Sequence, residues 1–272
     1  MKDHSLIYSP IGGAGEIGMN MYAYGFKKKN KVSYILVDAG VSFPKPDTEP
    51  GVDLIFPNPK LILDNLGDLE GIFITHAHED HLGAIGFIAS KIDCKIFCRK
   101  FTAEIVKDKL RKVNVTNKRV ITVKEWPHEV KLKNASVTFF PTTHSVPEAS
   151  FLIIKSSFGV VLHTGDFKID KNPILESAID YKELKKAIPE LSDSGKQFSG
   201  EVTEQAFQLL FDKKNQIHNS VVLCKITNES PNAYLAFGSD DPDLYKQSDS
   251  KYFLLHLANL VGQSFIKFIK EV

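Results

Sequence analysis

The sequence predicts an α/β protein in which stacked β-sheets are covered by helices. The first 170 residues contain many short segments rich in β-branched and aromatic residues, separated by glycine and proline turns. Helical patterns fall between some of these segments, which is the arrangement of layered α/β folds. With 43% apolar and 25% charged residues among 272, the chain can build a globular core, which excludes disorder as its main state.

The predicted elements of the first 170 residues are eight strands and two helices. The strands are short and flanked by turn residues, and they cover residues 20–26, 32–38, 71–75, 95–98, 119–123, 136–141, 150–155 and 160–163. Apolar positions at helical spacing predict helices over 81–91 and 101–112. The lysine-rich stretch 27–31 is typical of a hairpin tip between the first two strands.

The pattern of predicted strands and turns changes after residue 172. We expect helices over 181–188 and 202–211, a strand over 219–227, and a polar loop or linker over 228–251. The last segment places apolar residues at i, i+4 spacing and predicts a C-terminal helix with one apolar stripe. That stripe consists of Phe253, Leu257, Val261, Phe265 and Ile269.

Charge is unevenly distributed along the chain. The net charge is only +1, so the field of the whole molecule is weak. Residues 91–124, however, hold eleven Lys/Arg against three Asp/Glu, a local charge of +8. Such a stretch can hold a polyanion, and it can equally be the solvated surface of a helix and its loops.

Cysteine content and hydropathy indicate a cytoplasmic protein. Cys94, Cys98 and Cys224 are too few for a disulfide framework, and the gap between the first two does not match a zinc knuckle. We expect Cys94 and Cys98 to be buried small side chains on one strand face. The sequence has neither an apolar run near the roughly 20 residues of a membrane span nor the pattern of a secretion signal at its start.

The most informative stretch is Thr-His-Ala-His-Glu-Asp-His over residues 75–81, which follows an apolar strand. In an extended segment, side chains two apart point the same way, so His76 and His78 can bind one metal ion. Asp80 and His81 fall where the chain turns into a helix and can face a second ion. Three imidazoles and a carboxylate within six residues have no evident structural use, so the stretch predicts a metal site.

Two later fragments each contain a residue that can complete the set of metal ligands. His144 follows the apolar strand around 137–140, and Asp166 follows the strand 160–163. A histidine or aspartate at the end of a buried strand is held rigidly enough to serve a shared metal cluster. His144 alone would more often be a core histidine, but the repeated arrangement of a ligand after a strand favours metal binding.

These motifs resemble the metallo-β-lactamase superfamily, whose His-x-His-x-Asp-His signature is present as residues 76–81. Within it, the chain is similar to the ribonuclease J group of β-CASP nucleases. The matching strings are GGAGEIGMNM, VDAGVSFP, PGVDLIFP, THAHEDHLGA, TTHSVPEAS and HTGDFKID, in family order over roughly residues 10–175. The HSVP and HTGDFK strings are more specific to such nucleases than the histidine signature, which lactamases and glyoxalases share.

The resemblance implies a role for each candidate residue. The implied ligands are His76, His78 and His144 for a first zinc, Asp80 and His81 for a second, and Asp166 as the bridge between them. Asp80, His81 and Asp166 would thereby also be catalytic. Asp38 would orient a ligand histidine or hold the metal loop. Gly12, Gly13, Gly15 and Gly18 would let a loop near the site turn tightly.

The resemblance also implies an αββα metallo-β-lactamase-like sandwich over residues 1–175. The implied function is a zinc-dependent ribonuclease with 5′-to-3′ exonuclease and endonuclease activity in RNA processing and decay, with Mn²⁺ or Mg²⁺ as other metals. Two such ions activate water for in-line attack on a phosphodiester. RNA is the implied partner, together with a second copy or three further copies of the chain.

Residues 176–272 depart from the family pattern and are expected to be a remnant of the β-CASP region or an atypical C-terminal segment. Asp193 is a candidate for the first β-CASP motif, whereas the later Ser-Gly-His motif and the final histidine motif are missing. The second zinc site would then be one ligand short. Two alternatives follow: a catalytically impaired metal-binding relic that binds RNA or a partner, and a glyoxalase-like small-molecule hydrolase.

Overall fold

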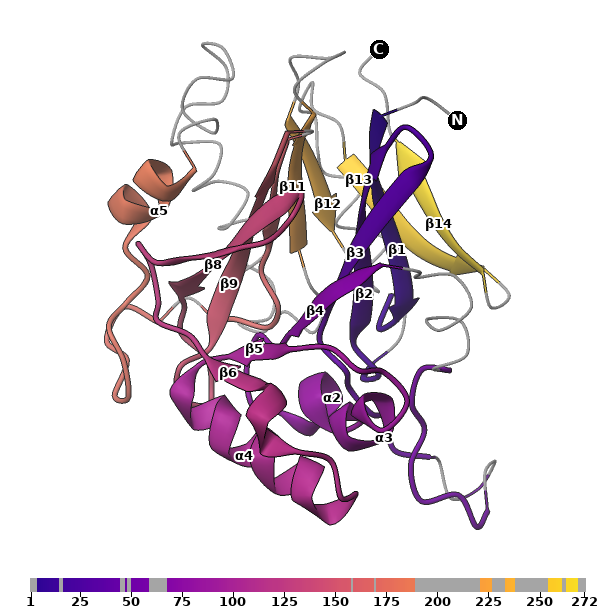
Figure 1. Cartoon of the computed structure of the whole chain (residues 1–272). Coiled ribbons are helices and arrows are strands. Elements are labelled where there is room, and N and C mark those ends of the chain that lie inside the picture. The colour runs from indigo at the N-terminus through magenta and orange to yellow at the C-terminus, as the bar shows by residue number, and fades with distance from the viewer. Residues whose placement is uncertain are drawn as a thin grey trace. The chain divides into compact units, whose positions relative to one another are not determined.

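The computed structural model describes residues 4–14, 17–44, 47, 50–58, 68–157, 159–168 and 170–188, and four strands within 221–268 (Figure 1). The chain divides into two compact units. The first consists of Met1–Lys124 with the short segments Leu132–Asn134 and Val146–Glu148. The second consists of Glu125–Lys131, Ala135–Ser145 and Ala149–Val272.

The first unit is built on a six-stranded sheet in the order β1-β2-β3-β4-β5-β6. Its strands are β1 His4–Gly12, β2 Met21–Lys28, β3 Lys31–Val37, β4 Leu69–Phe73, β5 Ile96–Cys98 and β6 Val120–Thr122. β1 to β3 are antiparallel, and β3 to β6 are parallel. All five strands predicted in this region are confirmed, and so is the lysine-rich tip between β2 and β3.

Strand β1 was not predicted, because its register shifts between Pro10 and Gly12 and its pattern of apolar residues is broken there. The loop that follows it contains Gly13 and Gly18 with φ of +80° and +85°. These left-handed conformations confirm that the glycines allow a tight turn. Gly15 lies outside the described residues.

The helices of the first unit are α2 Glu79–Leu82, α3 Ile85–Ala89, α4 Lys100–Lys112 and the 3₁₀ turn η1 Asn117–Arg119. Helix α4 runs beside β5 and β6 and confirms the prediction for 101–112 (Figure 1). Its Ala103, Val106 and Leu110 are buried in the core of this unit. Within this unit, a sheet covered by helices is therefore present, which is the layering of an α/β fold.

The prediction of one helix over 81–91 is wrong, because the chain forms two short helices there. The bond that would continue α2, from Ala84 N–H to the Asp80 carbonyl, is replaced by two others. Ala84 N–H donates to the Ala39 carbonyl, and the Asp80 carbonyl accepts from Asn20 N–H. Long-range partners thus satisfy the backbone groups that a continuous helix would have paired.

The second unit is built on an eight-stranded sheet in the order β14-β13-β12-β11-β10-β9-β8-β7. Its elements are β7 Glu129–Lys131, β8 Ala135–Pro141, β9 Ser150–Ser156, β10 Gly159–His163, helix α5 Tyr181–Ala187, β11 Val221–Ile226, β12 Ala233–Phe237, β13 Leu254–Leu260 and β14 Gln263–Phe268. The predicted strands 136–141, 150–155, 160–163 and 219–227 are confirmed, and so is the helix over 181–188. Asp180 caps α5 by accepting from the N–H groups of Lys182 and Glu183.

The C-terminal helix prediction is wrong. Leu257 and Phe265 of the apolar stripe fall on β13 and β14, which pair antiparallel. The other stripe residues, Phe253, Val261 and Ile269, lie outside the described residues. Most positions from 253 to 269 are apolar, so helical spacing and strand alternation both fit, and spacing alone cannot decide between them. The expected loop 228–251 likewise contains strand β12, which pairs with β11.

Strands from residues 176–272 belong to the same sheet as β8 to β10, because β11 pairs antiparallel with β10. The predicted helix over 202–211 and the candidate Asp193 lie outside the described residues. Within the part of the chain that the structure describes, no helix is both long and apolar enough to span a membrane.

Candidate metal centre

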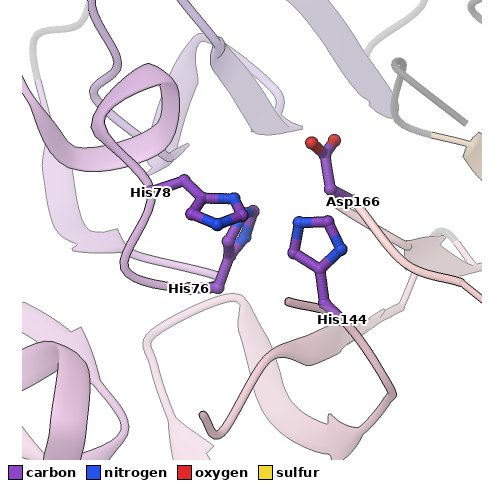
Figure 2. Close-up of side chains that lie close together, drawn as sticks. All are labelled: His76, His78, His144 and Asp166. Atoms are coloured by element: carbon purple, nitrogen blue, oxygen red, sulfur yellow. The ribbon is translucent and has the colours of Figure 1, made fainter. Parts of the chain in front are cut away.

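The loop after β4 brings two imidazole rings together. β4 ends at Phe73, so His76 and His78 lie beyond the strand rather than in it. Their side chains nevertheless point the same way, with His76 Nε2 and His78 Nδ1 3.1 Å apart and the rings edge to face (Figure 2). Two ring nitrogens facing each other are donors suited to one cation.

Asp80 and His81 form a second pair in the first turn of α2, as expected from the sequence. Asp80 Oδ2 lies 3.7 Å from His81 Nε2. The His81 ring is fully buried, whereas the Asp80 side chain is about one-third exposed. The His76 and His81 rings have centroids 4.1 Å apart, so the two pairs of donors are neighbours within this unit.

Asp38 holds this loop from the end of β3. Its Oδ2 accepts from His81 Nδ1 at 2.7 Å, and its Oδ1 accepts from Thr75 N–H at 2.8 Å. Burial raises the pKa of the Asp38 carboxyl, and the His81 imidazole and the Thr75 donors counteract that rise. Because His81 Nδ1 is held by Asp38, its Nε2 faces Asp80, and this is the contact that an orienting carboxylate requires.

Thr75 extends the same support to His76. The Thr75 hydroxyl donates to Asp38 Oδ2 at 2.9 Å and accepts from His76 Nδ1, also at 2.9 Å. With Nδ1 of His76 used in this way, Nε2 is the nitrogen that faces His78. One buried carboxyl group therefore orients His81 directly and His76 through a hydroxyl.

Asn20 is a site residue that sequence reasoning missed. Its Nδ2 donates to the Asp80 carbonyl at 3.1 Å and lies 3.1 Å from His81 Nε2. The Tyr22 hydroxyl donates to Asn20 Oδ1 at 2.9 Å, which fixes the amide with its nitrogen toward the loop. The string GGAGEIGMNM contains Asn20, so that motif was the available signal.

In the second unit, His144 and Asp166 form a further pair. A His144 ring nitrogen and an Asp166 carboxylate oxygen lie within 4.8 Å of each other (Figure 2). Their segments are joined by backbone pairing, because Lys168 N–H donates to the Thr143 carbonyl at 2.8 Å and the Thr143 hydroxyl donates to the Lys168 carbonyl. This isolated bridge beyond the ends of β8 and β10 thus sets His144 beside Asp166, in the manner expected of ligands that follow strands.

The donor types of both units fit a divalent cation. Imidazole nitrogens and carboxylate oxygens are the usual protein ligands of zinc, and they also suit manganese. In each unit the donors are buried or half-buried and face another donor, which isolated surface histidines do not do. Six residues carry these donors: His76, His78, Asp80, His81, His144 and Asp166.

Many cations of the basic stretch 91–124 are neutralised by acidic partners. Helix α4 pairs Lys107 with Glu104, and Arg111 and Lys112 with Asp108. Arg119 is largely buried and donates to the carbonyls of Ala89, Ile92 and Cys94. That arginine therefore supports the fold, and the stretch is less available to a polyanion than its local charge suggests.

The two described cysteines are unsuited to metal ligation or nucleophilic attack. Cys98 is buried on β5, and Cys94 is half-buried just before that strand. Burial raises the pKa of the Cys94 thiol to about 11 and that of Cys98 to about 12, so both remain protonated at neutral pH. Burial of Cys98 on the strand agrees with its predicted structural role.

Comparison with known proteins finds a matching family and several similar proteins. The family described as "Beta-lactamase superfamily domain" matches residues 33–180. Ribonuclease J of Sinorhizobium meliloti is 36% identical over 179 residues, covering 66% of this chain and 32% of that protein. Ribonuclease J 1 of Streptococcus pyogenes is 39% identical over 180 residues, covering 65% of this chain and 31% of that protein. The chain thus spans about a third of the length of these relatives.

Among solved structures, the metallo-β-lactamase fold protein YhfI from Bacillus subtilis matches with a TM-score of 0.42 and 18% sequence identity. The match covers 62% of this chain and 65% of that one.

Proposed function

This chain belongs to the β-lactamase superfamily, and we propose that it is a metal-dependent hydrolase that cleaves RNA phosphodiester bonds. The family match confirms the predicted fold class, and the identities of 36% and 39% confirm the predicted likeness to ribonuclease J. The name of those relatives, ribonuclease J, indicates RNA as the substrate class. Because the chain spans about a third of their length, its activity and substrate remain our proposal.

The observation that carries the proposal is the network around Asp38. A buried carboxyl group costs free energy, and a fold retains one where it is fully hydrogen-bonded. Here the Asp38 carboxyl group accepts hydrogen bonds from Thr75 N–H, the Thr75 hydroxyl and His81 Nδ1. These bonds orient the His81 ring directly and the His76 ring through Thr75, so that each ring faces a neighbouring donor. This arrangement supports a prepared metal site better than a structural histidine cluster.

We propose that His144 and Asp166 complete the same centre. In this proposal His76, His78 and His144 hold one zinc, Asp80 and His81 hold a second, and Asp166 serves both. Each residue offers an atom of the required type, and each pair is fixed within its own unit. Residues 1–175, which contain all six, form the catalytic domain in this proposal.

The chain's own residues bind the cations and fix the protonation of the ligands. Asp38 keeps a proton at His81 Nδ1, and Thr75 accepts the proton at His76 Nδ1, so both Nε2 atoms keep a lone pair. When bound, two divalent cations lower the pKa of water toward about 7 and neutralise charge on phosphate oxygens. Burial of His76 and His81 limits competition from bulk water.

The test is cleavage of 5′-monophosphorylated RNA by the purified protein with added zinc or manganese. We expect cleavage that disappears in His76→Ala and in Asp166→Ala. Label at the 5′ end and, separately, at the 3′ end distinguishes release of single nucleotides from internal cuts, which tests the finer proposal of both exonuclease and endonuclease activity. Glu104→Ala, which removes an exposed carboxylate on α4, is the matched control and should cleave normally.

Three outcomes would contradict the proposal in different ways. Binding of RNA without cleavage would support the impaired relic. Hydrolysis of a thioester such as a glutathione ester, with RNA left intact, would support the glyoxalase-like alternative. Cleavage that survives both substitutions would locate the activity elsewhere or in a contaminant.

A further inference from the structure

We propose that Lys109 is a positioning residue for the loop over residues 75–81. It acts through an ion pair with Glu79, which lies between the proposed ligands His78 and Asp80. All of these residues belong to the first unit. The inference rests on the proposed function, because it concerns how ligands of the proposed metal centre are placed. In this proposal neither Lys109 nor Glu79 contacts metal or substrate.

The ion pair joins two elements that are far apart in the sequence. Lys109 Nζ on α4 donates to Glu79 Oε2, in the first turn of α2, at 2.8 Å. The lysine side chain is 20% exposed and that of the glutamate 52%, so the pair is only partly screened by solvent. Other cations of α4, Lys107, Arg111 and Lys112, pair with carboxylates three or four residues away on the same helix. Those pairs stay within α4, whereas the pair of Lys109 fastens α4 to the loop.

Two glycines leave room for this contact. On α3, a Cβ at Gly86 would lie 3.2 Å from the Lys109 carbonyl oxygen, so the glycine allows α3 and α4 to approach closely. Just after α2, a Cβ at Gly83 would lie 2.8 Å from Glu79 Oε2. A side chain at position 83 would therefore displace the carboxylate from the place where Lys109 binds it. The packing of three helices thus agrees with the ion pair.

Glu79 is held by its main chain as well as by its side chain. Its carbonyl accepts from Val41 N–H at 3.1 Å and from Gly83 N–H at 2.7 Å. The buried carboxyl group described above orients two of the four proposed ligands in this loop. The other two, His78 and Asp80, flank Glu79 in the chain. Fixing Glu79 from α4 therefore supports the ligands on both of its sides.

The experiment measures the zinc affinity of the full chain by competition with a chromophoric chelator, so it does not depend on activity. If Lys109 acted only through its charge, its removal would strengthen zinc binding, because like charges repel. Positioning predicts the opposite sign. Lys109→Met keeps the aliphatic stem, and we expect it to bind zinc about fivefold more weakly, the upper end for such an ion pair. Lys109→Arg keeps a cation and should stay within about twofold of wild type.

Lys107→Met is the matched control. It removes the same charge from the same helix, at a side chain that is 28% exposed, and breaks only the pair with Glu104. We expect unchanged zinc affinity. A loss equal to that of Lys109→Met would show a general effect of charge on α4 and would overturn the inference.

A double-mutant cycle tests whether Lys109 acts through Glu79. Glu79→Gln should also weaken zinc binding, and Lys109→Met should cause no further loss in that background. In the metal-free protein, the amides of Val41 and Gly83, which donate to the Glu79 carbonyl, should exchange hydrogen faster in Lys109→Met than in wild type. Additive losses, or zinc binding in Lys109→Met as tight as in wild type or tighter, would overturn the inference while leaving the metal centre in place. If the wild-type chain itself binds no zinc, the proposed metal centre fails first, and the inference fails with it.

Discussion

The two sets of proposed ligands are fixed by different means. In the first unit, a buried side-chain network of Asp38, Thr75 and Asn20 orients the loop over residues 75–81. In the second unit, backbone pairing between Thr143 and Lys168 sets His144 beside Asp166. Single side-chain substitutions should therefore reduce zinc affinity and stability far more in the first unit. A backbone hydrogen bond survives the substitution of a side chain, whereas a side-chain hydrogen bond does not.

Asp38→Ala should have the largest effect. It leaves Thr75 N–H, the Thr75 hydroxyl and His81 Nδ1 without an acceptor in a fully buried site, and it places alanine at a φ of +62°. Removing one partner of a buried charged pair costs about 3–5 kcal/mol. We expect a loss of that size in the free energy of unfolding, measured by urea titration of the metal-free protein.

Asp38→Asn is the matched control for that change. Asparagine tolerates the left-handed conformation and keeps one acceptor oxygen, so the loss should be smaller, about 1–3 kcal/mol. If Asp38→Ala and the wild type have equal free energies of unfolding, then the hydrogen bonds of this carboxyl group do not hold the loop over residues 75–81.

Thr75→Val should have an intermediate effect, mainly on metal binding. Valine keeps the shape of threonine but removes the hydroxyl that connects Asp38 to His76, while Thr75 N–H can still donate to Asp38. Loss of such an outer partner lowers metal affinity about 10–100-fold. Zinc competition measures this, and the free energy of unfolding should fall by only about 1–3 kcal/mol.

The contrast also explains what the sequence could predict. The ligand types, their spacing and the strand before each of them are local features, so His76, His78, Asp80 and His81 could be proposed without a structure. Asn20 lies in the matching string GGAGEIGMNM, but its role depends on a bond to Asp80 sixty residues away, which the string by itself does not show. Neither asparagine nor threonine is distinctive in composition, and their function comes from long-range pairing.

Contacts between residues far apart in the sequence also limited the prediction of secondary structure. The strands around the motifs were predicted because β-branched runs with flanking turns are unambiguous. The helix over 81–91 was wrong because Asn20 and Ala39 take backbone bonds that a helix would have made. The C-terminal helix was wrong because β13 and β14 are apolar at most positions, and pairing between strands decided the outcome.

Thr143→Val should have the smallest effect and is the direct counterpart of Thr75→Val. Both threonines are buried, and both substitutions remove one hydroxyl with little change of shape. Here Lys168 N–H still donates to the Thr143 carbonyl after the change, so His144 should keep its place beside Asp166. We expect zinc affinity within about threefold of wild type and a loss of about 0.5–1.5 kcal/mol in the free energy of unfolding. If the two valine variants lose zinc affinity equally, then side chains rather than backbone pairing hold the second set of ligands.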